Sequence, residues 1–512
     1  MSKNKNSENP LIITSICVIL AVLVIVLFAF IKSEYYTVQT IAGTDPETES
    51  SEISVTTVSQ ATSAQTEVAD TTAEPGATSA TTTATYATAK MPETDSPNID
   101  YPADYEQLIP VVYLETSKEV TSRKTYVTGK ISIDYPLDEF PDFSGATMQI
   151  RGRGNSTWGL SKKPYKIKLD SKTSLFGLTA AKDWVLLAEH TDPSFLRNLS
   201  AFDTARIMDN IPFVPTAHSV DVYMNGAYIG VYTLCEQVES KKGRIPLDDV
   251  PDNISNPNDI GYLIEVGEGF ASYGGKVGID SFDVDGLYGV QVKTPDYTDD
   301  ENPLTAAQFK YIKEYFQDTT KALKSGKNIE NYIDIDSFVD WFLVNELYYN
   351  LDGACKRSFW LVKQPNGKLK VATVWDYDHA AANYSREESI SDRYSRWAVS
   401  LDIKSGDLRY HYSYNWISFL LKTPEFKNAL KSRWAQKGNS LLDAALTSID
   451  NNAALLRYSA QMNFQRWKIL GVRVSLQGSA VYKLTSFDAH VAQLKDFLVM
   501  RKGEMDKLID NL

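Results

Sequence analysis

The chain has 512 residues, of which 43% are hydrophobic and 23% charged, as is typical of globular proteins, and its length allows roughly two to four domains. Its formal net charge of −13 argues against a nucleic-acid-binding protein, because such proteins present a basic surface to the phosphate backbone. Three cysteines are too few for a disulfide framework. Cys17 lies in an apolar segment, so Cys235 and Cys355 form either one pair or, as the favoured reading, two buried small hydrophobic residues.

The N-terminal region predicts a membrane anchor. Residues 11–31 form an uncharged run of 21 residues, which is about 31 Å long as a helix and enough to span a bilayer. We expect this segment to remain uncleaved, because a signal peptide has a shorter apolar region and a small-residue cleavage site. Lys3 and Lys5 precede it, whereas the first basic residue after Lys32 is Lys90. This bias predicts a cytoplasmic tail over residues 1–10 and an extracellular C-terminal domain, in a single-pass protein of the cell membrane.

Residues 37–98 contain mainly Thr, Ser, Ala and acidic residues, as in "ATSATTTATYATAK". Such a segment has too little apolar surface to form a core, so we expect a disordered stalk. The folded domain then covers residues 99–512.

The first half of this domain is rich in strand patterns. We expect strands over 111–117, 124–135, 146–152, 164–169, 262–266 and 289–293, where β-branched and aromatic residues are bounded by turn residues. Asn225-Gly226 predicts a type I′ turn in a hairpin over 220–234. A helix over 195–208 is expected to be capped by Asp192, with Pro193 in its first turn.

The second half is predicted to be mostly helical. Apolar residues at three- and four-residue spacing indicate helices over 305–324 and 335–349, and further helices run to the C-terminus. Two strands are expected between them, over 358–363 and 368–375. The fold class is therefore α+β, with a β-rich lobe followed by a helical lobe, and the cleft between two such lobes is a common ligand site.

The first candidate site is the basic turn "RGRGNSTW" and the strand after it, "KKPYKIKL". Its glycines let backbone N–H groups approach a phosphate, and Arg151 and Arg153 add charge-assisted hydrogen bonds. A tight turn with solvated arginines is the alternative. On a strand Lys166 and Lys168 share one face, which is either directed at a phosphate or solvated.

Glu236 follows an apolar strand, where an unpaired buried carboxylate is costly. It either pairs with an inward-pointing lysine or lies at the strand end in water.

Three aspartates form the strongest candidate site. Asp352 follows a predicted helix and precedes a strand, and Asp376 and Asp378 end the next strand. A hairpin framed by aspartates directs several carboxylates to one place, and hard cations such as Mg²⁺ prefer carboxylate and phosphate oxygens. If the chain stays extended, Asp376 and Asp378 share a side. Solvent-exposed turn aspartates are the alternative, and His379 is expected to be a structural neighbour.

Several of these segments occur together in one order: "RGRGNSTW…KKPYKIKL", "DWVLLAEHTDPSFLRN", "VDVYMNGAYIGVYTLCEQVE", "NLDG" and "VWDYD". This combination resembles the spore coat protein H (CotH) kinase family. The resemblance covers about residues 109–433. It implies an atypical protein-kinase-like fold that uses ATP and Mg²⁺ or Mn²⁺ to phosphorylate proteins.

The resemblance also implies roles for single residues. Asp352 resembles the catalytic aspartate, and Asp376 the metal-binding aspartate, with Asp378 beside it. The lysine–glutamate pair of kinases would be Lys163 with Glu236. The phosphate side of the ATP site would be formed by Arg151, Arg153 and Asn155.

One position departs from ordinary protein kinases. Their catalytic loop carries an Asn five residues after the Asp, for a second Mg²⁺, whereas position 357 is Arg and 358 is Ser. Two hypotheses therefore remain: an active, membrane-anchored kinase of surface or secreted proteins, and a non-catalytic surface module that binds a partner or matrix.

Overall fold

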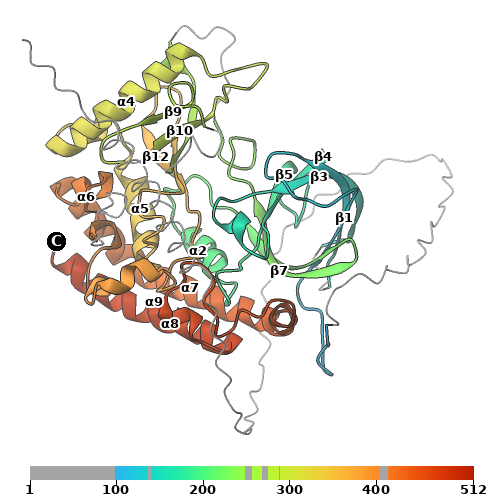
Figure 1. Cartoon of the computed structure of the whole chain (residues 1–512). Helices are drawn as coiled ribbons and strands as arrows, with labels where there is room; N and C mark the ends of the chain where they lie inside the picture. Colours follow the sequence, from blue (N-terminus) through green and yellow to red (C-terminus); the bar gives the residue numbers. More distant parts are fainter. Residues whose placement is uncertain (1–98, 137–139, 248–255, 268–274, 288, 403–412) are drawn as a thin grey trace, which may run out of the picture. The chain divides into compact units, whose positions relative to one another are not determined.

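The computed structural model describes residues 99–136, 140–247, 256–267, 275–287, 289–402 and 413–512 (Figure 1). They belong to a compact unit over Ala87–Leu512. The predicted cytoplasmic tail, membrane helix and stalk, over residues 1–10, 11–31 and 37–98, lie outside the described residues. Within the described ranges, none of the helices combines the length and apolar character that a membrane span requires.

Seven strands form a closed barrel in the order β1-β2-β3-β4-β5-β7-β6 (Figure 1). Neighbouring strands pair antiparallel, except that β1 pairs parallel with β6 and so closes the barrel. Their bounds are Val111–Thr116, Val127–Asp134, Phe143–Gly152, Tyr165–Thr173, Ala181–Leu187, Ala217–Met224 and Ala227–Glu236 for β1 to β7. Alternate apolar side chains fill the interior, as expected for strands with one buried face.

The strand predictions for this region are confirmed, including the hairpin of β6 and β7. Asn225 and Gly226 have φ values of 51° and 83°, as a type I′ turn requires. Strand β5 was not predicted from the sequence.

A second sheet has the order β12-β11-β8-β10-β9 and is antiparallel throughout. Its strands are β8 (Tyr262–Gly267), β9 (Ser281–Asp283), β10 (Gly289–Thr294), β11 (Phe359–Lys363) and β12 (Leu369–Thr373). The two strands predicted within the mostly helical second half, β11 and β12, therefore join strands of the first half in one sheet. The β11–β12 hairpin pairs with β8 because an exposed strand edge leaves backbone groups unpaired.

The helices gather around this sheet and beside the barrel. They are α2 (Arg197–Ala205), α4 (Ala306–Ser325), α5 (Ile335–Leu347), α6 (Trp416–Leu420), α7 (Pro424–Arg466), α8 (Ser479–Tyr482) and α9 (Phe487–Asp510). The long helix α7 contacts α2, α5, α9 and strand β7. This helix therefore joins the barrel to the helical part of the same unit.

Helix α2 begins later than predicted. Pro193 lies in the turn before the helix, and Phe195 has a φ of 59°, which a continuing α-helix does not allow. Asp192 nevertheless caps the helix from outside, because its Oδ2 accepts a hydrogen bond from Arg197 N at 2.9 Å.

The buried apolar side chains form two clusters, one inside the barrel and a larger one among the second sheet and the helices. The fold is thus a mixed α+β arrangement with a β-rich region and a helical C-terminal part. Cys235 and Cys355 are buried and free, which confirms the favoured reading of two small hydrophobic residues over a disulfide.

Candidate active site

Asp376 lies just beyond strand β12, in a strained loop. Its φ is 68°, a conformation that non-glycine residues rarely adopt, so the chain is not extended here, and the condition under which Asp376 and Asp378 would share a side is not met. Two contacts hold it there. Ser358 Oγ donates to Asp376 Oδ2 at 2.8 Å, and Asn350 Nδ2 donates to the Asp376 carbonyl at 3.0 Å. Both donors come from the loop between α5 and β11.

Asp378 is held from the loop that leads into helix α2. Thr191 Oγ1 donates to Asp378 Oδ2 at 2.7 Å, and Asn383 Nδ2 donates to the Asp378 carbonyl, also at 2.7 Å. The same Asn383 amide donates to the Thr191 carbonyl. Two segments far apart in the sequence are thereby fixed against each other.

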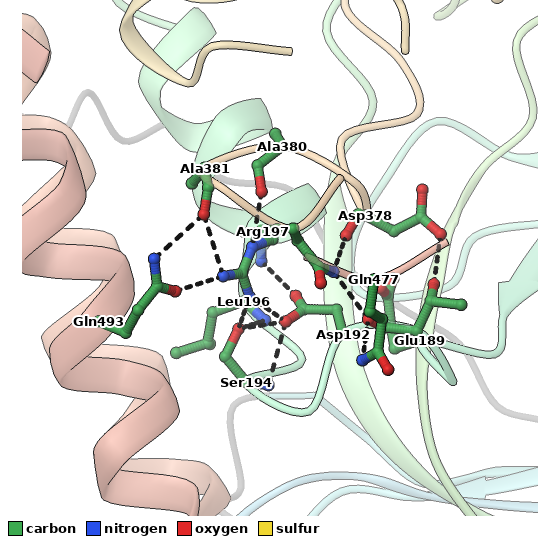
Figure 2. Close-up of polar contacts among 12 residues, drawn as sticks. Glu189, Asp192, Ser194, Leu196, Arg197, Asp378, Ala380, Ala381, Gln477 and Gln493 are labelled. Carbon is green, nitrogen blue, oxygen red and sulfur yellow. Dashed lines mark hydrogen bonds and ion pairs between the residues drawn. The ribbon is translucent and has the colours of Figure 1, made fainter. Parts of the chain in front are cut away.

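The buried Arg197 supports the loop after β12 that carries Asp376 and Asp378. Its Nε donates to the Ala380 carbonyl at 2.9 Å, and its Nη2 donates to the Ala381 carbonyl at 3.4 Å (Figure 2). Asp192 pairs with its Nη1, and both side chains of this ion pair are fully buried. Gln493 of α9 accepts from Arg197 Nη2 at 2.6 Å.

Helix α2 holds the loop at a second point. Asn198 Oδ1 accepts a hydrogen bond from Tyr377 N at 2.6 Å, while Asn198 Nδ2 donates to the Glu189 carboxylate. The segment "TDPSFLRN" therefore acts as a rigid support for "WDYDHAA".

The carboxylates at this place are crowded. Burial, followed by the charges of Asp378 and Asp352, raises the pKa of Asp376 to about 7. Burial, followed by the charges of Asp192 and Asp378, raises the pKa of Glu189 to about 8. This negative field is one that a bound cation would relieve.

His379 lies in the same negative electrostatic field as these carboxylates. Burial opposes its protonation, but the charges of Asp378 and Asp352 together raise its pKa. Its Nδ1 lies 2.9 Å from the Asn383 carbonyl. The histidine is therefore a neighbour of the carboxylates, as the sequence predicts.

Asp352 lies in the loop between α5 and β11, close enough to Asp376 to influence its pKa. Its Oδ1 accepts a hydrogen bond from Arg357 Nη1 at 2.8 Å, and the two side chains form an ion pair. The antiparallel pairing of β11 with β12 brings the two loops together, as expected for a hairpin framed by aspartates.

The glycine-rich turn reaches this site through Arg153. The Arg153 guanidinium lies over the Trp375 ring at 5.6 Å, and burial lowers its pKa while the charges of Cys235 and Asp376 oppose that effect. Gly152 is required here, because a Cβ at this position would lie 2.3 Å from the Trp158 ring. One arginine of the turn therefore faces the carboxylates.

The other residues of the turn are directed elsewhere. Arg151 donates to the Arg123 carbonyl and lies over the Tyr126 ring at 5.2 Å. The exposed Asn155 accepts from Arg123 Nη1 at 3.3 Å. The structure thus brings Arg153, but neither Arg151 nor Asn155, into contact with the carboxylate loops.

Lys163 and Glu236 are not joined by an ion pair among the described residues. Lys163 Nζ donates to the Trp158 carbonyl at 2.7 Å and lies over that ring at 5.3 Å. Glu236 instead accepts from Thr216 N at 2.9 Å and pairs with Arg244 at 3.9 Å. The kinase-like pair is therefore absent from this geometry.

Of the two strand lysines, only Lys168 takes the solvated alternative. Lys168 is exposed and Lys166 pairs with Asp183 at 3.0 Å, because both alternate with the interior residues of β4. The inward-pointing lysine is their neighbour Lys162, which has 1% exposure.

Sequence reasoning missed Lys162. It donates to the Val231 carbonyl and to Asn463 Oδ1, and lies 4.6 Å from the Tyr232 ring centroid. Burial, opposed by the charge of Glu189, lowers its pKa to about 7. Lys162 and Lys163 lie in a loop, where no periodic pattern shows which of two adjacent side chains points inward. The pair "KK" was the one sequence signal at this position.

The donors at the site are of one chemical kind. Carboxylate oxygens, which suit hard divalent cations, come from Asp376 and Asp378, with Glu189 nearby. Over the described parts of the chain, no three His, Cys, Asp or Glu side chains form a group able to hold a metal ion by themselves. A cation here would need further oxygen ligands from elsewhere.

The fold and site define a mixed α+β protein whose strand ends and helix-supported loops gather aspartates beside a basic, glycine-rich turn. The model of the CotH kinase protein family matches residues 150–505, which is more than half of the chain, so the chain belongs to this family. The match includes every element of the site, and it gives the protein a kinase-like domain. A search of curated proteins found no match.

Proposed function

We propose that the protein is a membrane-anchored, ATP-dependent kinase that transfers the γ-phosphate to hydroxyl groups of surface or secreted proteins. The observation that carries the proposal is the convergence of Asp352, Asp376 and Asp378, next to Arg153, inside the region that matches the CotH kinase family. We assign a two-lobed, kinase-like role to the two parts of the domain: the barrel bears the glycine-rich turn, and the part built from the second sheet and the helices bears the aspartates.

Asp376 and Asp378 would hold Mg²⁺ or Mn²⁺. Their carboxylates fit such a cation chemically, and the pKa of Asp376 is raised by burial and then by the charges of Asp378 and Asp352, which a cation would offset. Mg²⁺ typically binds one or two carboxylates plus phosphate oxygens and waters, so two aspartates suffice in the presence of ATP. When bound, the metal neutralises charge on the transferred phosphoryl group.

Asp352 and Arg153 would carry the other two roles. Asp352 orients the acceptor hydroxyl and accepts its proton. It lies beside Asp376, but it is held by Arg357, whereas Asp376 is held by Ser358, so the two carboxylates can serve different roles. Arg153 donates charge-assisted hydrogen bonds to the phosphates from the glycine-rich turn.

The test is phosphate incorporation by the purified full-length chain, with ATP and Mg²⁺ or Mn²⁺, into itself and into generic protein substrates. We expect Asp352→Asn to bind ATP normally and to lose activity by about 10²–10⁴-fold, as the loss of a general base does. The matched control is Asp318→Asn, at an exposed position on α4. Wild-type incorporation by Asp352→Asn would remove this residue from the mechanism.

The alternative is a non-catalytic module that binds a partner or matrix. One observation favours it: Arg357 occupies the position where protein kinases carry a metal-binding Asn. If the wild-type chain incorporates no phosphate with either metal and several substrates, this alternative replaces the kinase.

The anchor and the extracellular position of the domain remain part of the proposal, supported by the 21 uncharged residues of segment 11–31 and the lysines before it. Protease added to intact cells should remove the C-terminal domain. Protection in intact cells, with cleavage only after lysis, would reverse the orientation.

A further inference from the structure

A cavity of about 460 Å³ lies on the outside of the barrel, among residues that take no part in the aspartate site. Strand β1 pairs with β6 here and closes the barrel, with Tyr113 opposite Tyr223. The lining residues are Tyr101, Tyr105, Gln107, Val111, Tyr113, Asp134, Tyr135, Pro136, Asp142 and Tyr223. Its volume is within the range of small-molecule sites.

Five tyrosines line this cavity, and four of their side chains contact one another. Tyr113 and Tyr223 stack at 5.6 Å with an interplanar angle of 27°. Tyr101 packs edge-on against Tyr105 at 4.8 Å, and its hydroxyl lies 2.9 Å from that of Tyr223. The rings are therefore already arranged before a ligand arrives, which lowers the entropic cost of binding.

Two of these rings are open to solvent. Tyr101 is 52% exposed and Tyr113 39% exposed, although large aromatic side chains generally bury most of their surface. Aromatic faces carry negative electrostatic potential and attract cations, most strongly where several rings surround one charge.

Two carboxylates add to that potential at the rim. Asp134 lies close enough to the Tyr113 hydroxyl to add to the effect of burial in raising the pKa of that tyrosine, and Tyr135 N donates to Asp142 Oδ1 at 2.9 Å. Partial burial and the negative charge of Asp142 raise the pKa of the Asp134 carboxyl. Among the residues that the structure describes, no Lys, Arg or His forms an ion pair with either aspartate.

We propose that this cavity binds a small organic cation with an alkylammonium head, which the tyrosine faces surround and Asp134 and Asp142 neutralise. Neutral ligands do not need two carboxylates that lack a cationic partner among the described residues, and anions are repelled by them. The site does not depend on the kinase proposal, because none of its residues belongs to the aspartate site.

The experiment compares two probes of the same shape. Choline carries a quaternary ammonium group, and 3,3-dimethylbutan-1-ol has the same branched shape with carbon in place of the charged nitrogen. Calorimetric titration of the full-length protein at low salt should show saturable binding of choline that is at least about tenfold tighter than binding of the alcohol, a difference of about 1.4 kcal/mol. n-Butylammonium, titrated in parallel, distinguishes a primary from a quaternary head.

Variants then locate the binding. Asp134→Asn and Tyr113→Leu each change a solvent-accessible residue, and we expect both to weaken choline binding at least fivefold with an unchanged melting temperature. The matched control is Tyr414→Leu, a tyrosine with 49% exposure that does not line this cavity. Equal affinity for choline and the alcohol, no saturable binding of any ammonium probe, or wild-type affinity in both cavity variants would overturn the proposal.

Discussion

Arg357 Nη1 lies 2.8 Å from Asp352 Oδ1, so the guanidinium pairs with the aspartate that resembles a catalytic residue. Ordinary protein kinases place a metal-binding Asn at this spacing. Here the following residue, Ser358, donates to Asp376 instead. The two residues after Lys356 thus orient two different carboxylates of the site from one short stretch of chain.

This pairing predicts a separation of activity from stability. The exposed fractions of the two side chains are 18% and 23%, so solvent partly screens the ion pair, and breaking it costs less than the roughly 3–5 kcal/mol of a fully buried pair. Arg357→Gln should therefore lower the melting temperature less than Arg197→Gln does, yet reduce phosphate incorporation roughly tenfold by releasing Asp352. Steady-state kinetics should place this loss in kcat, because Arg357 acts through Asp352 and not on ATP. A loss confined to the KM for ATP would contradict this positioning role.

The raised pKa of Asp376 predicts how stability depends on pH. The folded state binds this proton more tightly than the unfolded state does, since the pKa rises from 3.8 to about 7. The stability that protonated Asp376 contributes to the folded state is fully present below about pH 4 and is lost as the pH rises through about 7. In EDTA, Asp376→Asn, which cannot ionise, should melt at a higher temperature than wild type at pH 8.

The advantage of Asp376→Asn should shrink steadily as the pH is lowered from 8 to 4. Thermal melts at one-unit intervals measure it, with Asp318→Asn as the surface control. Melting temperatures that change in parallel with pH for wild type and Asp376→Asn would contradict a raised pKa of Asp376.

The two arginines of the glycine-rich turn should differ in their effect on ATP binding. Charge-assisted hydrogen bonds contribute roughly 1.5–3 kcal/mol, so Arg153→Ala should raise the Kd for ATP at least tenfold. Arg151→Ala should have a smaller effect, because its guanidinium is directed at the Arg123 carbonyl and the Tyr126 ring. Calorimetry with ATP and Mg²⁺ measures both. Equal losses would indicate that Arg151 turns toward the nucleotide.

The buried pair of Arg197 with Asp192 should be essential to the domain. Removing one partner of a buried ion pair typically costs about 3–5 kcal/mol, because the other charge stays buried without compensation. Arg197→Gln should therefore lower the urea midpoint strongly. Lys321→Ala is the matched control, since its pair with Asp318 is exposed and contributes little. Similar midpoints for Arg197→Gln and wild type would contradict the supporting role of Arg197.

The sequence predicted those parts that local patterns encode. Alternation marks the barrel strands, Asn225-Gly226 marks the hairpin, and the aspartates at the ends of the β11–β12 hairpin mark the site. The pairing of β8 with β11 was out of reach, because about a hundred residues separate the two strands. Glu189 and Lys162 were missed for a related reason: both lie in loops, where no period reveals which side chains point inward.

The last long helix contributes to the aspartate loop through Gln493, whose side chain bonds both Arg197 and the Ala381 carbonyl. A second contact from the same helix, Arg501 to Glu346, is buried as well. During synthesis, all barrel strands and all three aspartates leave the ribosome before these residues do. A premature stop codon ahead of α9 would therefore yield a chain that has every predicted catalytic residue but lacks the contacts of Gln493 and Arg501. The aspartate loop can thus reach its folded geometry only after the whole chain has been translated.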